Sequence, residues 1–240
     1  MGQLRVRRLG LLAGAHQAEG VAVVIDVYRA FTSAALILHL GAEKLLLVAG
    51  AEEALDLKRS PGTLAVGEVG GRKVPGFDLG NSPAEVLAAG RALFEGRVVV
   101  QRTSAGVQGA VAAARRCDRV FLGSFLTAAA TARAIAALSP PPEVVSLVPM
   151  GLEGRVPTPD DEGCADYLEH LLTGRPYDHV ATLQRIVEHE ATKKFLRGDA
   201  PHYPPADPIY CLQRDLLDFC VVAGEEDGRL VARAWRAPAT

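Results

Sequence analysis

The sequence predicts an α/β fold of three layers, α/β/α, around a largely parallel sheet that is mixed at its edge. Expected strands alternate with expected helices through about the first 150 residues, which is typical of parallel sheets with helical crossovers. Residues 21–25 read Val-Ala-Val-Val-Ile, a nearly continuous β-branched run that indicates a strand buried on both faces. Residues 67–83 are rich in Gly and Pro without apolar periodicity, and such long loops are often functional.

Apolar runs and their flanking residues define the expected elements in chain order. Strands are expected at residues 3–9, 21–25, 44–48, 63–66, 97–100, 119–122 and 144–148. Helices are expected at residues 30–40, 51–58, 84–89, 104–116, 127–138, 160–173, 180–196 and 210–217. Gly41 ends the first expected helix. For the helix expected at 84–89, Ser82 suits the N-cap position and Pro83 suits the first turn.

The C-terminal part of the chain predicts a hairpin. Residues 219–223 and 230–234 are mostly apolar and flank the turn Glu-Glu-Asp-Gly at 225–228. We expect this hairpin to add antiparallel strands at an edge of the sheet. Because neither a repeat nor a low-complexity linker is visible, we expect one domain over residues 1–240, with a helical subdomain at about 160–196.

Composition and charge exclude several classes of protein. Hydrophobic residues make up 49% and charged residues 22% of the chain, which is a globular balance. A net charge of −2 argues against nucleic acid as a partner. The longest stretches without Asp, Glu, Lys or Arg, residues 30–42 and 120–132, are shorter than the roughly 20 residues of a membrane span. We therefore expect neither a nucleic-acid nor a membrane partner.

The four cysteines form no Cys-x-x-Cys pair, so we expect them to be reduced and the protein to be cytoplasmic. Apolar stretches with few charges, such as residues 128–138, suit either the core or an interface between copies. We expect a homo-oligomer, a dimer.

Polar residues follow five of the expected strands. In an open parallel sheet, ligands bind beyond the carboxyl ends of the strands, so these residues are expected to converge. The candidates are Asp26, Arg29, Thr32, Glu68, Arg102, Ser104, Ser124, Asp160 and Asp161, with Asn81 and Ser82 in the long loop.

The candidate residues indicate hard-metal and phosphate chemistry. Asp26, Glu68, Asp160 and Asp161 offer the oxygen ligands that Mg²⁺ prefers. Hydroxyl groups at helix starts, together with arginines, bind anions. The sequence contains no P-loop, no dinucleotide-binding fingerprint and no nucleophile elbow.

Each candidate also has a purely structural interpretation. Asp26, Ser104 and Ser124 suit helix N-caps, and Asp160 with Asp161 suits the N-terminal end of a helix dipole. Glu68 fits an exposed loop, and Asn81 with Ser82 fits an Asx turn followed by a cap.

Several strings of residues resemble the 2-phosphosulfolactate phosphatase family. They are Val-Val-Ile-Asp-Val-Tyr-Arg-Ala-Phe-Thr at 23–32, Gly-Glu-Val-Gly-Gly at 67–71, Gly-Phe-Asp-Leu-Gly-Asn-Ser-Pro at 76–83, Thr-Ser-Ala-Gly at 103–106, Gly-Ser-Phe at 123–125 and Asp-Asp-x-x-Cys-Ala at 160–165. Together they span about residues 20–170, and residues 207–215 are similar to the family's tail.

The resemblance implies an α/β/α fold and the Mg²⁺-dependent hydrolysis of (R)-2-phospho-3-sulfolactate, a step of coenzyme M biosynthesis. The residues that match polar positions of the family's motifs are Asp26, Arg29, Glu68, Asp78, Asn81, Ser104, Ser124, Asp160 and Asp161. The roles that follow are our hypotheses. Glu68, Asp160 and Asp161 would bind the metal, and Asp26 would be a ligand or a water-orienting base. Arg29 and the Ser104 loop would hold phosphate, and Arg102 the sulfonate or carboxylate. We assign Thr32, Asn81, Ser82 and Ser124 to substrate binding.

One departure keeps alternatives open. Residues 104–107 read Ser-Ala-Gly-Val where the commoner family pattern is Thr-Asn-Gly-Thr. The alternatives are a non-catalytic anion-binding or sensor protein, and a phosphatase or lyase that acts on a different phosphorylated acid.

Overall fold

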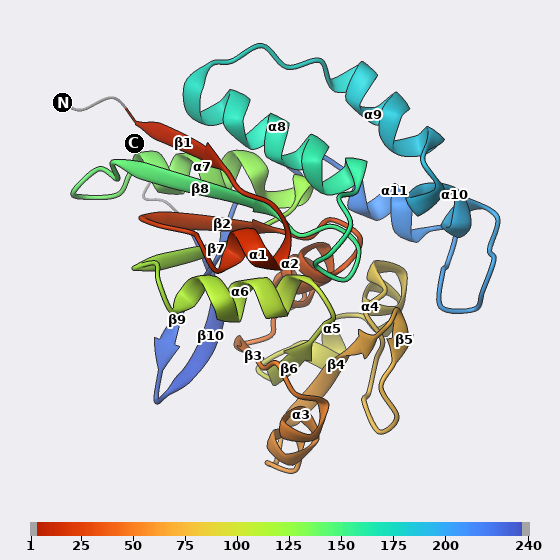
Figure 1. Cartoon of the computed structure of the whole chain (residues 1–240). Helices are drawn as coiled ribbons and strands as arrows, with labels where there is room; N and C mark the ends of the chain where they lie inside the picture. The colour runs from red at the N-terminus through yellow and green to blue at the C-terminus, as the bar shows by residue number, and fades with distance from the viewer. Residues whose placement is uncertain (1–3, 237–240) are drawn as a thin grey trace.

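The computed structural model describes residues 4–236, and it contains one ten-stranded sheet flanked by helices (Figure 1). The strands are β1 (Arg5–Arg8), β2 (Val21–Ile25), β3 (Lys44–Leu47), β4 (Thr63–Val69), β5 (Arg72–Lys73), β6 (Val98–Arg102), β7 (Arg119–Gly123), β8 (Val144–Pro149), β9 (Cys220–Glu226) and β10 (Arg229–Trp235). Their order across the sheet is β1-β8-β2-β7-β9-β10-β3-β6-β4-β5. Residue 3 of the expected first strand lies outside the described residues.

Eleven α-helices and one short 3₁₀ helix lie within the described part of the chain. They are α1 (Leu11–Ala15), α2 (Ala30–His39), α3 (Ala51–Lys58), α4 (Pro83–Ala89), α5 (Arg91–Phe94), α6 (Gly106–Ala114), η1 (Phe125–Thr127), α7 (Ala128–Ala136), α8 (Pro159–Thr173), α9 (His179–Glu188), α10 (Glu190–Leu196) and α11 (Asp207–Cys211). The sequence did not predict α1, α5 or β5, which are all five residues or shorter.

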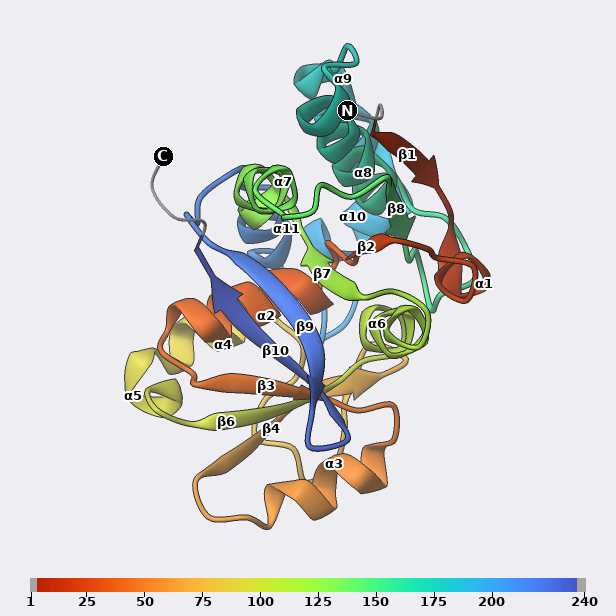
Figure 2. The same ribbon diagram turned by 90° about the vertical axis from the view of Figure 1, so that its left-hand side faces the viewer.

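The pairing confirms a largely parallel sheet but corrects the position of the hairpin. Strands β1, β8, β2 and β7 form one parallel group, and β3, β6 and β4 form another. The hairpin β9–β10 joins the two groups, because β9 pairs antiparallel with β7 and β10 pairs antiparallel with β3. The prediction that this hairpin lies at an edge was wrong, and Figure 2 shows it in the middle of the molecule.

Alternating side chains build the three layers. On β2, Ala22 and Val24 belong to the cluster that contains buried residues of α2 and α6, whereas Val23 and Ile25 belong to the cluster with α7 and α8. In the other strand group, Ala65 of β4 packs in a third cluster with α3. Helices therefore cover both faces of the sheet, as the sequence predicts for a doubly covered parallel sheet.

The expected helix over 180–196 is two helices. Helix α9 ends at Glu188, and His189 has an extended backbone with φ of −84° and ψ of 148°. The Nδ1 atom of His189 accepts a hydrogen bond from the Ala191 N–H at 3.1 Å, so His189 caps α10. In place of the helix expected at 210–217, the structure contains α11 at Asp207–Cys211, which begins and ends earlier. Pro208 lies in its first turn, where proline is tolerated.

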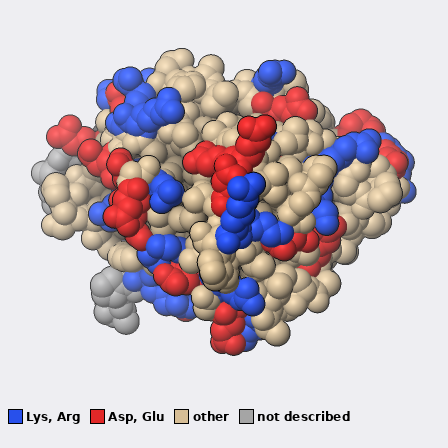
Figure 3. Space-filling model, turned by 90° about the horizontal axis from the view of Figure 1, so that it is seen from below, with Lys and Arg blue, Asp and Glu red and all other residues tan. Residues whose placement is uncertain are grey.

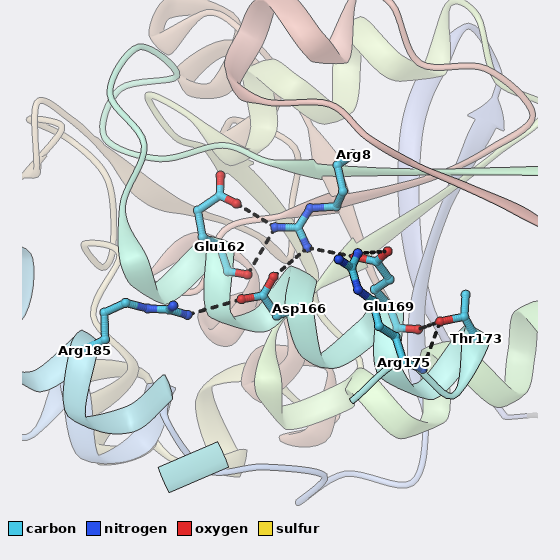
Figure 4. Close-up of polar contacts among 7 residues, drawn as sticks. All are labelled: Arg8, Glu162, Asp166, Glu169, Thr173, Arg175 and Arg185. Atoms are coloured by element: carbon cyan, nitrogen blue, oxygen red, sulfur yellow. Dashed lines mark hydrogen bonds and ion pairs between the residues drawn. The ribbon is translucent and has the colours of Figure 1, made fainter. Parts of the chain in front are cut away.

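An ion-pair network fixes the edge strand β1 to α8 (Figure 4). The Arg8 guanidinium donates to a Glu162 carboxylate oxygen at 2.6 Å and to Asp166 Oδ1 at 3.2 Å. Arg185 of α9 reaches the other oxygen of Asp166 at 3.2 Å, so α9 joins the same network. Seen from below, basic and acidic side chains are interspersed on the surface (Figure 3).

Among the described residues, none of the helices combines the length and apolar character that a bilayer crossing requires. The four cysteines are buried and unpaired within that part of the chain. The division into domains stays a prediction.

Candidate active site

A cavity of about 240 Å³ lies beyond the carboxyl ends of β2, β4 and β6. Its polar wall includes Asp26, Arg29, Glu68, Asn81, Ser104 and Lys194. The structure thus brings together five of the predicted site residues from segments far apart in the chain. The rest of the wall comes from the loop after β4, from residues 151–153 between β8 and α8, and from Phe195 and Tyr203.

Asp26 follows β2 directly and is held between the starts of two helices. The Ala30 N–H donates to its Oδ1 at 3.0 Å, and the Gly106 N–H donates to its Oδ2 at 2.7 Å. The residue is 5% exposed, and this burial raises the pKa of Asp26 from 3.8 to about 7, with further contributions from the charges of Glu68 and Asp160. A carboxyl group that lines the cavity therefore titrates near neutral pH.

Asp160 and Asp161 begin α8 and reach back to the loop after β2. Asp161 accepts from the N–H groups of Val27 and Gly151, both at 2.7 Å, so each of its oxygens has a backbone donor. Asp160 accepts from the Tyr28 N–H through Oδ2 at 3.2 Å, while its buried Oδ1 has no partner among the described residues. Burial raises the pKa of Asp160 to about 6 and raises that of Asp161 well above its ordinary value.

Glu68 lies at the end of β4 and organises the loop after β6. Its oxygens accept from the N–H groups of Ser104 and Gly71, both at 2.6 Å, and from the Ser104 hydroxyl at 3.0 Å. The Arg102 guanidinium donates to the Glu68 carbonyl at 2.6 Å and to the Ala49 carbonyl at 3.1 Å. Arg102 therefore holds this loop in place and is not among the residues that line the cavity. Its assignment to the sulfonate or carboxylate of the substrate stays a prediction.

Arg29 is nearly buried and is held by Asp207, which the sequence interpretation missed as a site residue. The Arg29 Nη1 donates to Asp207 Oδ2 at 3.0 Å and to the His202 carbonyl at 2.8 Å. The other oxygen of Asp207 accepts from the Ser82 hydroxyl at 2.7 Å and from the Ala84 N–H at 3.0 Å. Asp207 thus links the loop after β2 to the start of α4. The family-like tail at 207–215 was the only sequence signal for it.

Lys194 is a second cation at the cavity that no motif indicated. Its ammonium lies 4.6 Å from the centre of the Tyr203 ring and 5.3 Å from that of Phe195. Burial and the charge of Arg29 lower the pKa of Lys194, whereas Asp160 raises it. It lies on α10, whose amphipathic sequence resembles that of any surface helix.

The remaining predicted residues do not line this cavity, although Asp160 lines a second cavity, of about 280 Å³, that shares Tyr28 and Lys194 with it. Thr32 is fully buried and donates to the Val27 carbonyl at 3.0 Å. Ser82 caps α4 by accepting from the Glu85 N–H at 3.2 Å, which confirms its capping interpretation. The hydroxyl of Ser124 is buried without a partner in the described part of the chain.

The carboxylates suit a cation that needs few protein ligands. Within residues 4–236 no group of three His, Cys, Asp or Glu side chains is arranged to hold one metal ion. The assignment of Glu68, Asp160 and Asp161 to a metal stays a prediction. Mg²⁺ commonly binds through one or two carboxylates together with substrate phosphate and water. The unpartnered Asp160 Oδ1, in a site rich in buried carboxylates, fits an ion of that kind.

A three-layer α/β fold with carboxylates and cations around a cavity at the strand ends defines an enzyme site for a small anion. The family model described as 2-phosphosulpholactate phosphatase matches residues 11–226. A protein of Deinococcus radiodurans is 41% identical over 69% of this chain and 67% of its own length. A Thermus thermophilus protein is 45% identical over 62% and 60%, and a Bacillus subtilis protein is 32% identical over 87% and 88%.

All three relatives carry the name “Probable 2-phosphosulfolactate phosphatase”. The chain belongs to the 2-phosphosulpholactate phosphatase family, whose members are phosphoric monoester hydrolases. The resemblance that the sequence strings indicated is confirmed.

Proposed function

We propose that the protein is a Mg²⁺-dependent phosphatase that hydrolyses (R)-2-phospho-3-sulfolactate to 3-sulfolactate and phosphate, a step of the coenzyme M pathway. Family membership supports this substrate. One observation carries the chemistry: Asp26, a buried carboxyl with a pKa of about 7, lines the same cavity as the cations Arg29 and Lys194. A phosphatase needs a proton acceptor beside positive charge that holds a dianion.

Asp160 would hold the Mg²⁺ ion through its free Oδ1, together with phosphate oxygens and water. Bound there, the ion would neutralise charge that develops on the transferring phosphoryl group. Arg29, fixed by Asp207, would bind the phosphate or carboxylate of the substrate as a preorganised cation.

Asp26 would act on the attacking water. Because its pKa lies near 7, Asp26 is substantially ionised at neutral pH and can accept a proton as the water oxygen approaches phosphorus. The N–H groups of Ala30 and Gly106 hold both carboxylate oxygens in place, which fixes the direction of that proton transfer.

The test is the release of phosphate from 2-phosphosulfolactate by the pure protein with Mg²⁺ or with EDTA. We expect release only with Mg²⁺, and we expect Asp26→Asn to lower kcat/KM by about 10²–10⁴-fold. The control is Asp118→Asn, an exposed position on the rim of a separate cavity beside Pro140, which should retain full activity.

Other outcomes identify the alternatives. A protein that binds the phosphorylated acid but releases no phosphate from any phosphomonoester is an anion-binding protein, and the proposal is then wrong. Phosphorus NMR that shows elimination instead of hydrolysis identifies a lyase. We also propose a cytoplasmic dimer, for which light scattering of the purified protein gives the mass in solution.

A further inference from the structure

Lys194 is a half-buried cation on the wall of the cavity that contains Asp26. Within residues 4–236, no hydrogen bond or ion pair joins its ammonium group to another residue. The ammonium instead lies against two aromatic rings, 4.6 Å from the centre of Tyr203 and 5.3 Å from that of Phe195. Ring faces attract a cation but accept none of its protons in ordinary hydrogen bonds, so its N–H donors stay available to a ligand.

Arg29 lies against the same two rings but is held differently. Its guanidinium carbon is 5.4 Å from the centre of Phe195 and 5.9 Å from that of Tyr203. Its Nη1 donates to Asp207 at 3.0 Å, which fixes the group and balances its charge. Arg29 is therefore a rigid, paired cation that suits phosphate binding, whereas Lys194 on the same rings keeps its protons for another atom of the substrate.

Lys194 and Asp26 reach the cavity from different walls. Asp26 follows β2 and is held by the starts of α2 and α6, whereas Lys194 comes from α10. Lys194 also lines the second cavity beside Asp160, which Asp26 does not. In phosphoryl transfer, the attacking and the leaving oxygen lie roughly in line on opposite sides of phosphorus. With the attacking water beside Asp26, the leaving oxygen points away from Asp26, toward a group on another wall.

The leaving group of such an ester is an alkoxide, a strong base that needs a proton as its bond to phosphorus breaks. Other donors on the wall are less suited to supply it. The Ser104 hydroxyl already donates to Glu68 at 3.0 Å, and the Arg29 guanidinium is a much weaker acid than an ammonium group. Burial raises the pKa of Tyr28, so its hydroxyl releases a proton less readily. Lys194 is the strongest acid of these four groups.

We propose that Lys194 is a catalytic residue, the general acid that gives a proton to the leaving ester oxygen. The inference rests on the proposed phosphatase function and adds a proton donor to it. As the water oxygen bonds to phosphorus, Asp26 takes a proton from that water. The bond from phosphorus to the ester oxygen breaks, its electron pair stays on that oxygen, and the oxygen takes a proton from Lys194 Nζ. The neutral amine then regains a proton from solvent, and Asp26 releases its own.

The test compares two substrates that differ in one atom, 2-phosphosulfolactate and its analogue with sulfur in place of the ester oxygen. A thiolate leaves without a proton, so the analogue does not need the acid. We expect Lys194→Met to lower kcat for the oxygen ester about 10²–10⁴-fold with little change in KM, and to lower kcat for the sulfur ester less than about threefold. Lys193→Met is the matched control, because Lys193 precedes Lys194 on α10 and lines neither cavity. It should retain full activity on both esters.

A second variant separates proton donation from charge. Lys194→Arg keeps the positive charge but holds its protons far more tightly. We expect its kcat for the oxygen ester to stay at least about tenfold below that of the unaltered protein, and its kcat for the sulfur ester to be nearly unchanged. Circular dichroism checks that each variant folds, and Lys194→Arg decides the question if Lys194→Met does not fold.

Three results overturn the assignment of Lys194 and leave the proposed function standing, because the unaltered protein still releases phosphate from the oxygen ester. They are an equal fall of kcat for both esters, an unchanged kcat for the oxygen ester, and full activity of Lys194→Arg on the oxygen ester. An unaltered protein that cleaves the oxygen ester but not the sulfur ester overturns the assignment as well. If the unaltered protein with Mg²⁺ releases no phosphate from either ester, the proposed function is wrong, and the assignment fails with it.

Discussion

Asp160 and Asp161 are neighbours in sequence, but their side chains have different hydrogen-bond partners. Both oxygens of Asp161 accept backbone N–H groups, which ties the start of α8 to the loop after β2 and to Gly151. Asp160 leaves one oxygen free beside other buried carboxylates. Asp161, unlike Asp26, does not line the cavity, and its hydrogen bonds anchor the start of α8. Asp160 keeps one oxygen that can bind a ligand, and the metal role predicted for Asp161 stays a prediction.

This difference predicts that the protein tolerates an amide better at position 160 than at position 161. The pKa of Asp160 is raised to about 6 in the folded protein. The folded state therefore loses stability as the pH rises from about 4 to about 6, and this loss persists at higher pH. Asp160→Asn keeps an acceptor for the Tyr28 N–H and removes that charge. In EDTA at pH 8 we expect the free energy of unfolding to rise by about 1–3 kcal/mol, with little change at pH 4.

Urea titrations at the two pH values measure the effect. Asp161→Asn is the matched comparison. In the native protein both Asp161 oxygens accept backbone N–H groups, so the NH₂ group of the asparagine would face one of these donors and leave it without an acceptor. We expect it to be less stable than Asp160→Asn at pH 8. Equal stability of the two variants would contradict the distinction.

The buried pair of Arg29 and Asp207 predicts a second effect of a single residue. Asp207 is fully buried, and Asp207→Asn leaves the Arg29 charge without its partner. We expect a loss of about 3–5 kcal/mol in the free energy of unfolding, together with a raised KM for the phosphorylated substrate. Asp218→Asn removes an exposed ion pair with Arg236 and should leave both quantities nearly unchanged.

At the scale of elements, α6 approaches Asp26 so closely that its first residue must be glycine. A Cβ atom at Gly106 would lie 2.7 Å from Asp26 Oδ2 and 3.0 Å from the Ala30 side chain. The small residues that the sequence concentrates in this helix therefore let its N-terminus reach the site.

Gly106→Ala should displace α6 or Asp26. We expect the loss of the 2.7 Å hydrogen bond to Asp26 Oδ2 and at least a tenfold fall in kcat/KM, because positioning errors of about 1 Å have effects of this size. Gly10→Ala has open space around the new methyl group and an extended backbone with φ of −133°, so it serves as the control. Full activity of Gly106→Ala would contradict the tight approach.

At the scale of the whole molecule, the hairpin β9–β10 controls how the two parallel groups face each other. Three successive antiparallel pairings reverse the ladder direction between β7 and β3. In a flat sheet, the carboxyl ends of β2 and β4 would then lie at opposite edges. Figure 2 shows β2 and β7 on one side of the hairpin and β3, β6 and β4 on the other, and the twist of the sheet between them brings Asp26 and Glu68 to one cavity.

A charge inside the hairpin should therefore disrupt the whole fold. Ala223 is 2% exposed and belongs to the largest core cluster, so Ala223→Asp would bury an unpaired carboxylate. We expect a loss of at least about 3 kcal/mol in the free energy of unfolding, measured by urea titration. Gly224→Asp, at the next and exposed position of the same strand, should have a far smaller effect.

The sequence by itself determined the strand–helix alternation and the family, because buried β-branched runs and glycine-rich strand ends are local patterns. It also pointed to Asp26, Arg29, Glu68 and Ser104 at or after strand ends and to Asn81 in the long loop. Their convergence on one cavity depends on the twist of the sheet across the hairpin, which the sequence did not predict. Only the tertiary structure placed the hairpin in the centre of the sheet, because an apolar strand has the same sequence pattern at an edge and in the middle. It alone separated Asp160 from Asp161 and added Asp207 and Lys194, since hydrogen-bond partners distant in the chain leave no local pattern.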